Sequence, residues 1–137
     1  MSERADVELR VPADGAYASV LRTTTAALAA RLDFTIEDIE DLRMAVAEAT
    51  AMVLEHADAG SDLVSHFTLA PGEMIVAVSV SAQSPGDPDY DSFGWQVLTT
   101  LATSAQVEAG GGRFTVSMTV NSTALGPAGP AGPEADA

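Results

Sequence analysis

The stretch TIEDIEDLRMAVAEATAMV, residues 35–53, carries the clearest structural signal in this sequence. Thr35 is followed three residues later by Asp38, which resembles a helix capping box with Asp in place of the usual Glu. Acidic side chains in the first turn suit the positive end of the helix dipole. Apolar residues then recur at steps of three and four and share one helix face: Ile39, Leu42, Val46, Ala49 and Val53. We therefore expect a long helix with one buried face, ended by Gly60.

Two elements are predicted before this helix. Val7–Val11 alternates apolar and polar residues, which is the pattern of a strand with one buried face. Residues 16–32 are rich in Ala and Leu and predict another helix. The three consecutive threonines at 23–25 lower the local helix propensity, because β-branched side chains lose rotamer freedom in a helix.

The remainder of the chain predicts a sheet interrupted by one helix. Ala70-Pro71-Gly72 and the glycines at 110–112 are hairpin signals. Residues 81–91 are rich in Pro, Gly and Asp, which is typical of a loop. The expected elements are strands over 63–69 and 73–80, a loop over 81–91, a helix over 93–105, and strands over 105–108 and 113–120. This order predicts an α+β fold, a two-layer sandwich of a mainly antiparallel sheet with helices on one face. We expect one domain over 1–121 and a disordered Gly/Pro/Ala tail over 122–137.

The charge limits the partners. The 137-residue chain has a formal net charge of −14, which repels phosphate backbones and anionic lipids and disfavours binding to nucleic acid or membrane. A basic protein partner fits this charge, although excess acid also serves solubility alone. The absence of cysteine excludes thiolate metal sites and suits a reducing compartment. The N-terminus has no apolar signal-peptide core, so we expect a cytoplasmic protein.

Several segments resemble the anti-sigma-factor branch of the GHKL ATPase superfamily, whose ATP-binding fold is the histidine-kinase-like or Bergerat fold. Their order and spacing across about residues 5–121 carry the resemblance more than any one of them. The segments are Leu9–Ala13, Leu32–Thr35, Leu42–Ala49 with Glu55–Ala57, and Phe93–Leu98. The chain is thus similar to the RsbW-type serine kinases.

The resemblance implies a partner-switching regulator of transcription. Proteins of this type bind a sigma factor and release it when a STAS-domain anti-anti-sigma protein competes, and many phosphorylate that competitor on serine with ATP. The implied partners are therefore a sigma factor and a STAS-domain protein, and a homodimer is compatible with the family. Arg22 aligns with a family arginine that contacts both partners, although an exposed helix charge is an equally simple interpretation of it.

The motifs for nucleotide binding are incomplete. In the family, a Glu and an Asn four residues apart on one helix serve the attacking hydroxyl and the Mg²⁺ ion. Here the Glu is Glu48, our candidate catalytic residue, which could also be a plain surface acid. The Asn position holds Met52, whose thioether is a poor ligand for Mg²⁺. No other metal site is expected, because the two histidines do not form a ligand set.

The two glycine motifs have also lost residues. The Asp-x-Gly-x-Gly motif falls on residues 82–86, where Ala82 replaces the Asp that binds adenine and Gly86 is retained. The last phosphate loop falls on residues 92–94, where Ser92 replaces one glycine and Gly94 is retained. The candidate cofactor-binding residues are thus Gly86 and Gly94. Each lost hydrogen bond weakens nucleotide binding by roughly 1–3 kcal/mol.

Three functions follow from these observations. The preferred one is a regulator that binds a sigma factor, a STAS-domain protein or both, and uses no cofactor. The first alternative is an active serine kinase that uses Mg·ATP despite the substitutions. The second is a non-catalytic scaffold or dimerisation module with the same fold.

Overall fold

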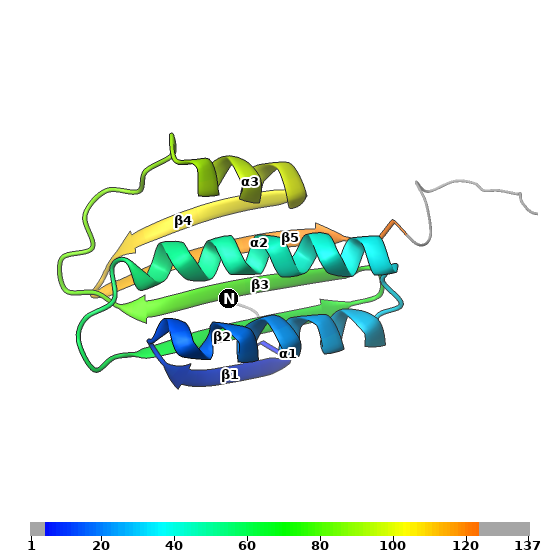
Figure 1. Ribbon diagram of the computed structural model, residues 1–137, viewed down its shortest axis with the longest axis horizontal. Coiled ribbons are helices and arrows are strands. Elements are labelled where there is room, and N and C mark those ends of the chain that lie inside the picture. The colour runs from blue at the N-terminus through cyan, green and yellow to red at the C-terminus, as the bar shows by residue number, and fades with distance from the viewer. Residues whose placement is uncertain (1–4, 124–137) are drawn as a thin grey trace, which may run out of the picture.

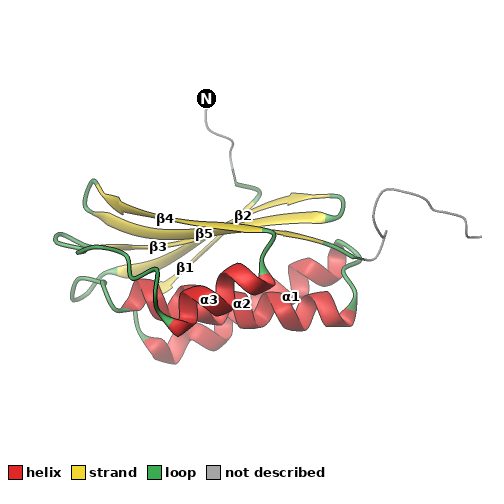
Figure 2. Ribbon diagram, turned by 90° about the horizontal axis from the view of Figure 1, so that it is seen from above, coloured by secondary structure: helices red, strands yellow, loops and turns green. Residues whose placement is uncertain are grey.

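A single antiparallel sheet carries all the helices on one of its faces. The structure, a computed structural model, describes residues 5–123. The five strands lie in the order β1-β2-β3-β5-β4, and Figure 2 shows the helices together below the sheet. This confirms the predicted α+β two-layer sandwich. The strands are β1 (Val7–Pro12), β2 (Asp62–Ala70), β3 (Glu73–Ser81), β4 (Ser104–Gly110) and β5 (Arg113–Asn121), and the helices are η1 (Gly15–Tyr17, a 3₁₀ turn), α1 (Ala18–Arg31), α2 (Ile36–Leu54) and α3 (Phe93–Leu101).

The core lies between the helices and the inner face of the sheet. Alternate residues of the central strand β3 and of its neighbour β5 are buried, as period-two patterning requires, and in β3 Ser79 is buried as well. Four of the five residues predicted for the apolar face of α2 are fully buried, and Ile39 is partly buried against the core. The buried apolar side chains of α2, β3 and β5 are Leu42, Ala45, Val46, Ala49, Val53, Met74, Val76, Val78, Val80, Phe114, Val116, Met118 and Val120.

The predicted capping box at the start of α2 is confirmed. The Thr35 hydroxyl accepts a hydrogen bond from the Asp38 N–H at 3.0 Å, and the Asp38 carboxylate accepts one from the Thr35 N–H at 3.3 Å. The same carboxylate accepts hydrogen bonds from the N–H of Thr123 at 2.9 Å and from its hydroxyl at 3.0 Å. Burial raises the pKa of Asp38, but these hydrogen bonds outweigh it and hold that pKa below its usual value.

Thr123, which contacts Asp38, belongs to the stretch over 122–137 that the sequence analysis assigned to the tail. The rest of the predicted tail, residues 124–137, lies outside the described residues.

The predicted end of α2 at Gly60 is wrong. The helix ends at Leu54, and the N–H groups of the next three residues donate to carbonyls three positions earlier, which tightens the chain into a turn before it meets the sheet. His56 stacks on Phe114 with ring centroids 3.9 Å apart. The Asp58 N–H donates to the Ser81 carbonyl at 2.9 Å, which ties this loop to the end of β3.

The predicted end of the last helix is also too late. α3 ends at Leu101, four residues before the expected end at 105. Ser104 pairs with Thr119 as the first residue of β4. Residues 104 and 105, which helix periodicity had assigned to the helix, therefore belong to the sheet. The two hairpin turns lie where the sequence predicts them.

α2 lies between the other two helices and positions the site. Figure 1 shows α1 on one side of α2 and α3 on the other. The chain reaches α3 from β3 through the loop over residues 82–92. Among residues 5–123, no helix is long and apolar enough to cross a membrane.

Candidate functional site

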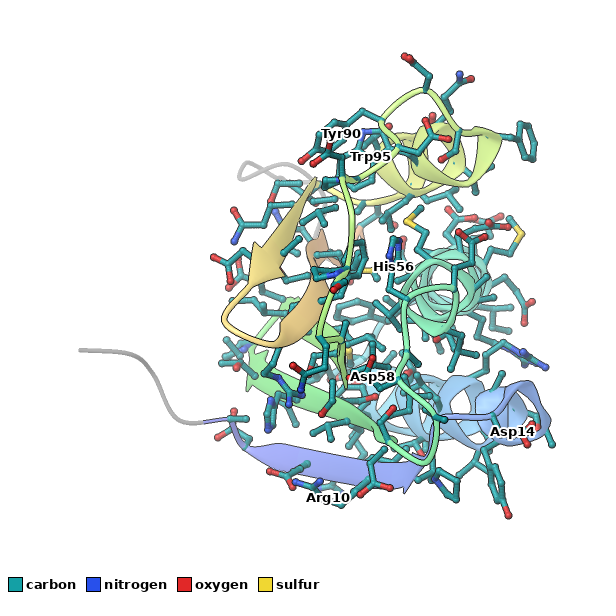
Figure 3. All side chains as sticks on the ribbon, turned by 90° about the vertical axis from the view of Figure 1, so that its left-hand side faces the viewer. Arg10, Asp14, His56, Asp58, Tyr90 and Trp95 are labelled. Carbon is teal, nitrogen blue, oxygen red and sulfur yellow. The ribbon has the colours of Figure 1, made fainter. Side chains whose placement is uncertain are left out.

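A cavity of about 350 Å³ lies at the end of the molecule where the loop over residues 82–92 joins the start of α3. Figure 3 looks onto this end, with Tyr90 and Trp95 beside α3 and His56 beyond the end of α2. The cavity is formed by α2, this loop, the first turn of α3 and the two last strands. Its lining residues are Glu48, Ala51, Met52, Glu55, His56, Asp87, Pro88, Asp89, Tyr90, Ser92, Gly94, Trp95, Val107 and Phe114.

The structure brings together Glu48, Met52 and Gly94, which the sequence assigned to one site. Glu48 and Met52 are one helical turn apart on α2 and face the first turn of α3. A β-carbon placed on Gly94 would lie 2.8 Å from Glu48 Oε1 and 3.4 Å from Met52 Cε. Gly94 is therefore the residue that lets α3 approach these two side chains.

Ser92 has a structural task that the motif comparison missed. Its hydroxyl accepts a hydrogen bond from the Trp95 N–H at 3.1 Å and so caps the N-terminus of α3. Serine is among the preferred residues for this position. The serine that replaces a phosphate-loop glycine thus caps a helix. A serine directly before an apolar run is the sequence pattern that indicates this cap.

Gly86 and Ala82 are not among the residues that line the cavity. Gly86 is exposed and has a positive φ of 75°, and a β-carbon added to it would meet no atom within 4 Å, so its glycine suits a turn in the loop. Ala82 is fully buried, and its N–H donates to the Gly112 carbonyl at 2.8 Å. Its methyl group offers no hydrogen-bond acceptor.

Aromatic residues that the sequence did not assign to the site form part of its wall. Of the seven Phe, Tyr and Trp residues in the chain, Tyr90, Trp95 and Phe114 line this one cavity. The Tyr90 and Trp95 rings meet edge to face, with centroids 5.2 Å apart. Nearly half of the aromatic residues of the chain thus lie around this one cavity.

The lining of the cavity carries several negative charges. Glu48, Glu55, Asp87 and Asp89 contribute carboxylates, whereas no Lys or Arg of the described chain lines the cavity. A polyphosphate needs cationic side chains, free N–H groups or a metal to bind. Within residues 5–123, no group of three or more His, Asp or Glu side chains is placed to hold a metal ion. The lining therefore offers a triphosphate four carboxylates and neither a lysine nor an arginine of the described chain.

Arg22 lies away from the cavity, on α1. Its side chain is partly exposed, and among the described residues that side chain makes no hydrogen bond or ion pair.

Known proteins resemble this chain in sequence and fold. No family model matches it. The serine-protein kinase RsbW of Halalkalibacterium halodurans is 39% identical over 88 residues, which are 64% of this chain and 52% of that protein. The serine-protein kinase RsbW of Bacillus pumilus is 38% identical over 63 residues, 45% of this chain and 39% of that protein. The chain thus spans about half or less of the curated relatives it matches.

A solved structure supports the fold. The crystal structure of the RsbU and RsbW domains of Rv1364c from Mycobacterium tuberculosis superimposes with a TM-score of 0.67 at 21% identity, covering 85% of this chain and 32% of that one. This likeness agrees with the expected GHKL-type fold. In sequence and in fold, the chain is thus similar to RsbW-type serine-protein kinases over part of their length.

Proposed function

We propose that this chain is an anti-sigma-factor-like regulator that acts by partner switching and does not use ATP as a kinase. It binds a sigma factor, a STAS-domain anti-anti-sigma protein, or both in competition. The proposal places the protein in the cytoplasm, where sigma factors meet RNA polymerase.

The composition of the cavity is the observation that carries this proposal. The cavity occupies the region between α2 and α3 where family motifs for nucleotide fall, yet it combines Met52 with four carboxylates. Two unit charges 4 Å apart interact by about 4 kcal/mol at an effective dielectric constant of 20, so acidic walls strongly oppose a triphosphate. Without a cation to offset this repulsion, binding of Mg·ATP in the family manner is unfavourable.

Partner binding depends on other surfaces. The family resemblance assigns it to Arg22 on α1, and α1 lies on the opposite side of α2 from α3 (Figure 1). Loss of nucleotide binding therefore leaves this surface intact. A net charge of −14 also favours association with a basic partner surface.

The experiment is a titration of the protein with Mg·ATP by calorimetry, paired with affinity capture of partners from the native cytoplasm. We expect no binding of Mg·ATP at micromolar concentrations and capture of a sigma factor or a STAS-domain protein. Capture must weaken with Arg22→Ala and persist with Arg31→Ala, which removes another α1 arginine. Recovery of neither partner class contradicts the proposed function.

An active kinase is the second candidate, and one contact favours it. Glu48 and Gly94, both retained from the family motifs, meet at the cavity wall. Micromolar Mg·ATP binding together with phosphate transfer to a STAS-domain serine, lost in Glu48→Gln, would establish this alternative. A stable homodimer that binds neither partner class would instead establish the scaffold.

A further inference from the structure

We propose that the cavity between α2 and α3 binds an organic cation, specifically a guanidinium group on an apolar stem. This inference goes beyond the partner-switching function and does not depend on it, because it rests on the cavity alone. The cavity of about 350 Å³ falls within the range of small-ligand pockets and exceeds the space that a single side chain needs.

The carboxylates fix the sign of the ligand charge. Glu55 and Asp87 are exposed at the rim, and their carboxylates make no hydrogen bond or ion pair among residues 5–123. Glu48 lies deeper, against α3, and Asp89 holds the loop by accepting a hydrogen bond from the Asp91 N–H at 3.0 Å. A cation that enters the cavity therefore meets two rim carboxylates whose charges nothing in the described chain offsets.

The aromatic wall favours a cation of delocalised charge. Tyr90 and Trp95 stand edge to face at 5.2 Å, and Phe114 is stacked against His56 at 3.9 Å on another part of the lining. The faces of Trp and Tyr attract cations through the ring quadrupole, and a planar guanidinium also stacks on them. An ammonium ion, which is compact and strongly hydrated, gains less from such a wall.

The N-terminus of α3 does not reverse this preference. A free helix N-terminus attracts anions, because its first N–H groups lack partners. Here the Ser92 hydroxyl already accepts from the Trp95 N–H, and the Glu48 carboxylate lies against Gly94 in the first turn. The Ser92 hydroxyl thus satisfies one of the first N–H groups of α3, and the nearby Glu48 carboxylate repels an anion that approaches the others.

A guanidinium of this kind has two sources, an arginine side chain of a partner protein and a small free molecule. N-acetyl-arginine methylamide represents the first and agmatine the second. N-acetyl-citrulline methylamide has nearly the same shape as the arginine probe but carries a neutral urea, so it isolates the charge.

Trp95 provides the measurement. It is the only tryptophan in the chain and it lines the cavity, so its fluorescence reports occupancy directly. We expect the arginine probe to change this fluorescence saturably and the citrulline probe to bind at least about tenfold more weakly. Raising the ionic strength should weaken the arginine probe, because rim charges are screened. Tighter binding of agmatine would identify a free ligand, and tighter binding of the arginine probe would identify a partner side chain; both support the site.

Two variants test whether the carboxylates and the aromatic side chain of the cavity lining contribute to binding. Glu55→Gln combined with Asp87→Asn should lower the affinity about tenfold, and Tyr90→Leu about threefold. Glu37→Gln combined with Asp41→Asn removes the same charge at the other end of α2 and should leave the affinity unchanged. Equal binding of the citrulline probe, equal loss in both double variants, or tighter binding of ADP than of either guanidinium overturns the proposal. None of these results depends on whether the protein binds a sigma factor.

Discussion

The carboxylate of Glu48 lies 2.8 Å from the point where a β-carbon on Gly94 would stand. This contact joins α2 to the first turn of α3 at the cavity wall. Close packing against Glu48 therefore explains a glycine at position 94 without any role in phosphate binding. Glu48 likewise has a packing contact, whether or not it takes part in catalysis. The two residues should therefore behave as an energetically coupled pair.

The coupling predicts how Gly94→Ala changes stability. Alanine exceeds glycine in helix propensity by up to about 1 kcal/mol, but in the native background its methyl group must push the Glu48 carboxylate aside. In a Glu48→Ala background the methyl group has room. We expect Gly94→Ala to raise the free energy of unfolding by up to about 1 kcal/mol there and by clearly less in the native background, measured by urea denaturation.

Gly15→Ala is the matched control for this cycle. No atom lies within 4 Å of its β-carbon position, so its effect should be the same in both backgrounds. If the two backgrounds also give equal values for Gly94→Ala, the contact does not exist in solution.

A buried hydroxyl on α2 predicts an unusual effect. The Thr50 hydroxyl is buried and has no hydrogen-bond partner among the described residues, whereas the Thr25 hydroxyl donates to the Leu21 carbonyl at 2.8 Å. Thr50→Val removes an unsatisfied polar group at constant shape and should be neutral or stabilising by about 1 kcal/mol. Thr25→Val should destabilise by about 1 kcal/mol. Thermal unfolding of the two variants side by side gives the comparison, and the reverse ranking would refute it.

Asp38 predicts a pH dependence of stability. Because the hydrogen bonds from Thr123 and Thr35 lower its pKa in the folded state, the ionised carboxylate stabilises the fold above its usual pKa of 3.8. This stabilisation is lost as the pH falls through the lower folded-state pKa. Asp38→Asn should therefore lower the melting temperature at neutral pH, at a cost of about 1–2 kcal/mol, and the difference should close in acid. Asp41→Asn is the exposed control on the same helix, and a pH-independent difference for Asp38→Asn would contradict the prediction.

We expect a substitution of Arg22 to weaken partner binding without changing the stability of the fold. The side chain makes no hydrogen bond or ion pair within residues 5–123, so Arg22→Ala should leave the melting temperature within about 1 °C of native. Affinity for the captured sigma factor or STAS-domain protein should fall at least about fivefold. Unchanged affinity would show that the family role of this arginine does not carry over.

Replacing Met52 alone with the family residue should not restore the binding of Mg·ATP. Met52→Asn restores an oxygen ligand for Mg²⁺ at the family position, but the acidic lining and the buried Ala82 remain. Calorimetry with Mg·ATP should therefore detect no micromolar binding in either protein. Binding gained by this single change would show that the metal ligand, and not the charge of the cavity, is what the native protein lacks.

Local patterns in the sequence predicted the elements well where local interactions decide them. The capping box at Thr35 and Asp38 and the alternation in β3 and β5 require only near neighbours, and both are found. The end of α2 depends instead on His56 meeting Phe114, 58 positions away in the chain, and no local pattern contains that contact. The same holds for the start of β4, which pairing with β5 decides.

The site was predicted in part for the same reason. Motif spacing placed Glu48, Met52 and Gly94 near one another, and all three line the cavity; two of them lie one turn apart on a single helix, so local spacing was enough to pair them. It did not foresee that the side chains of Tyr90 and Phe114 would line the same cavity, since they come from a loop and a distant strand. It also placed Gly86 in the site, whereas the cavity lining does not include it.

The hydrogen bonds between Asp38 and Thr123 span 85 positions of the chain. During synthesis on the ribosome, α2 emerges long before the residue that completes its cap. The helix can form early with Thr35 alone, but its N-terminus reaches its final set of hydrogen bonds only when β5 has been made and docked. The completed cap of α2 therefore depends on residues that are made 85 positions later.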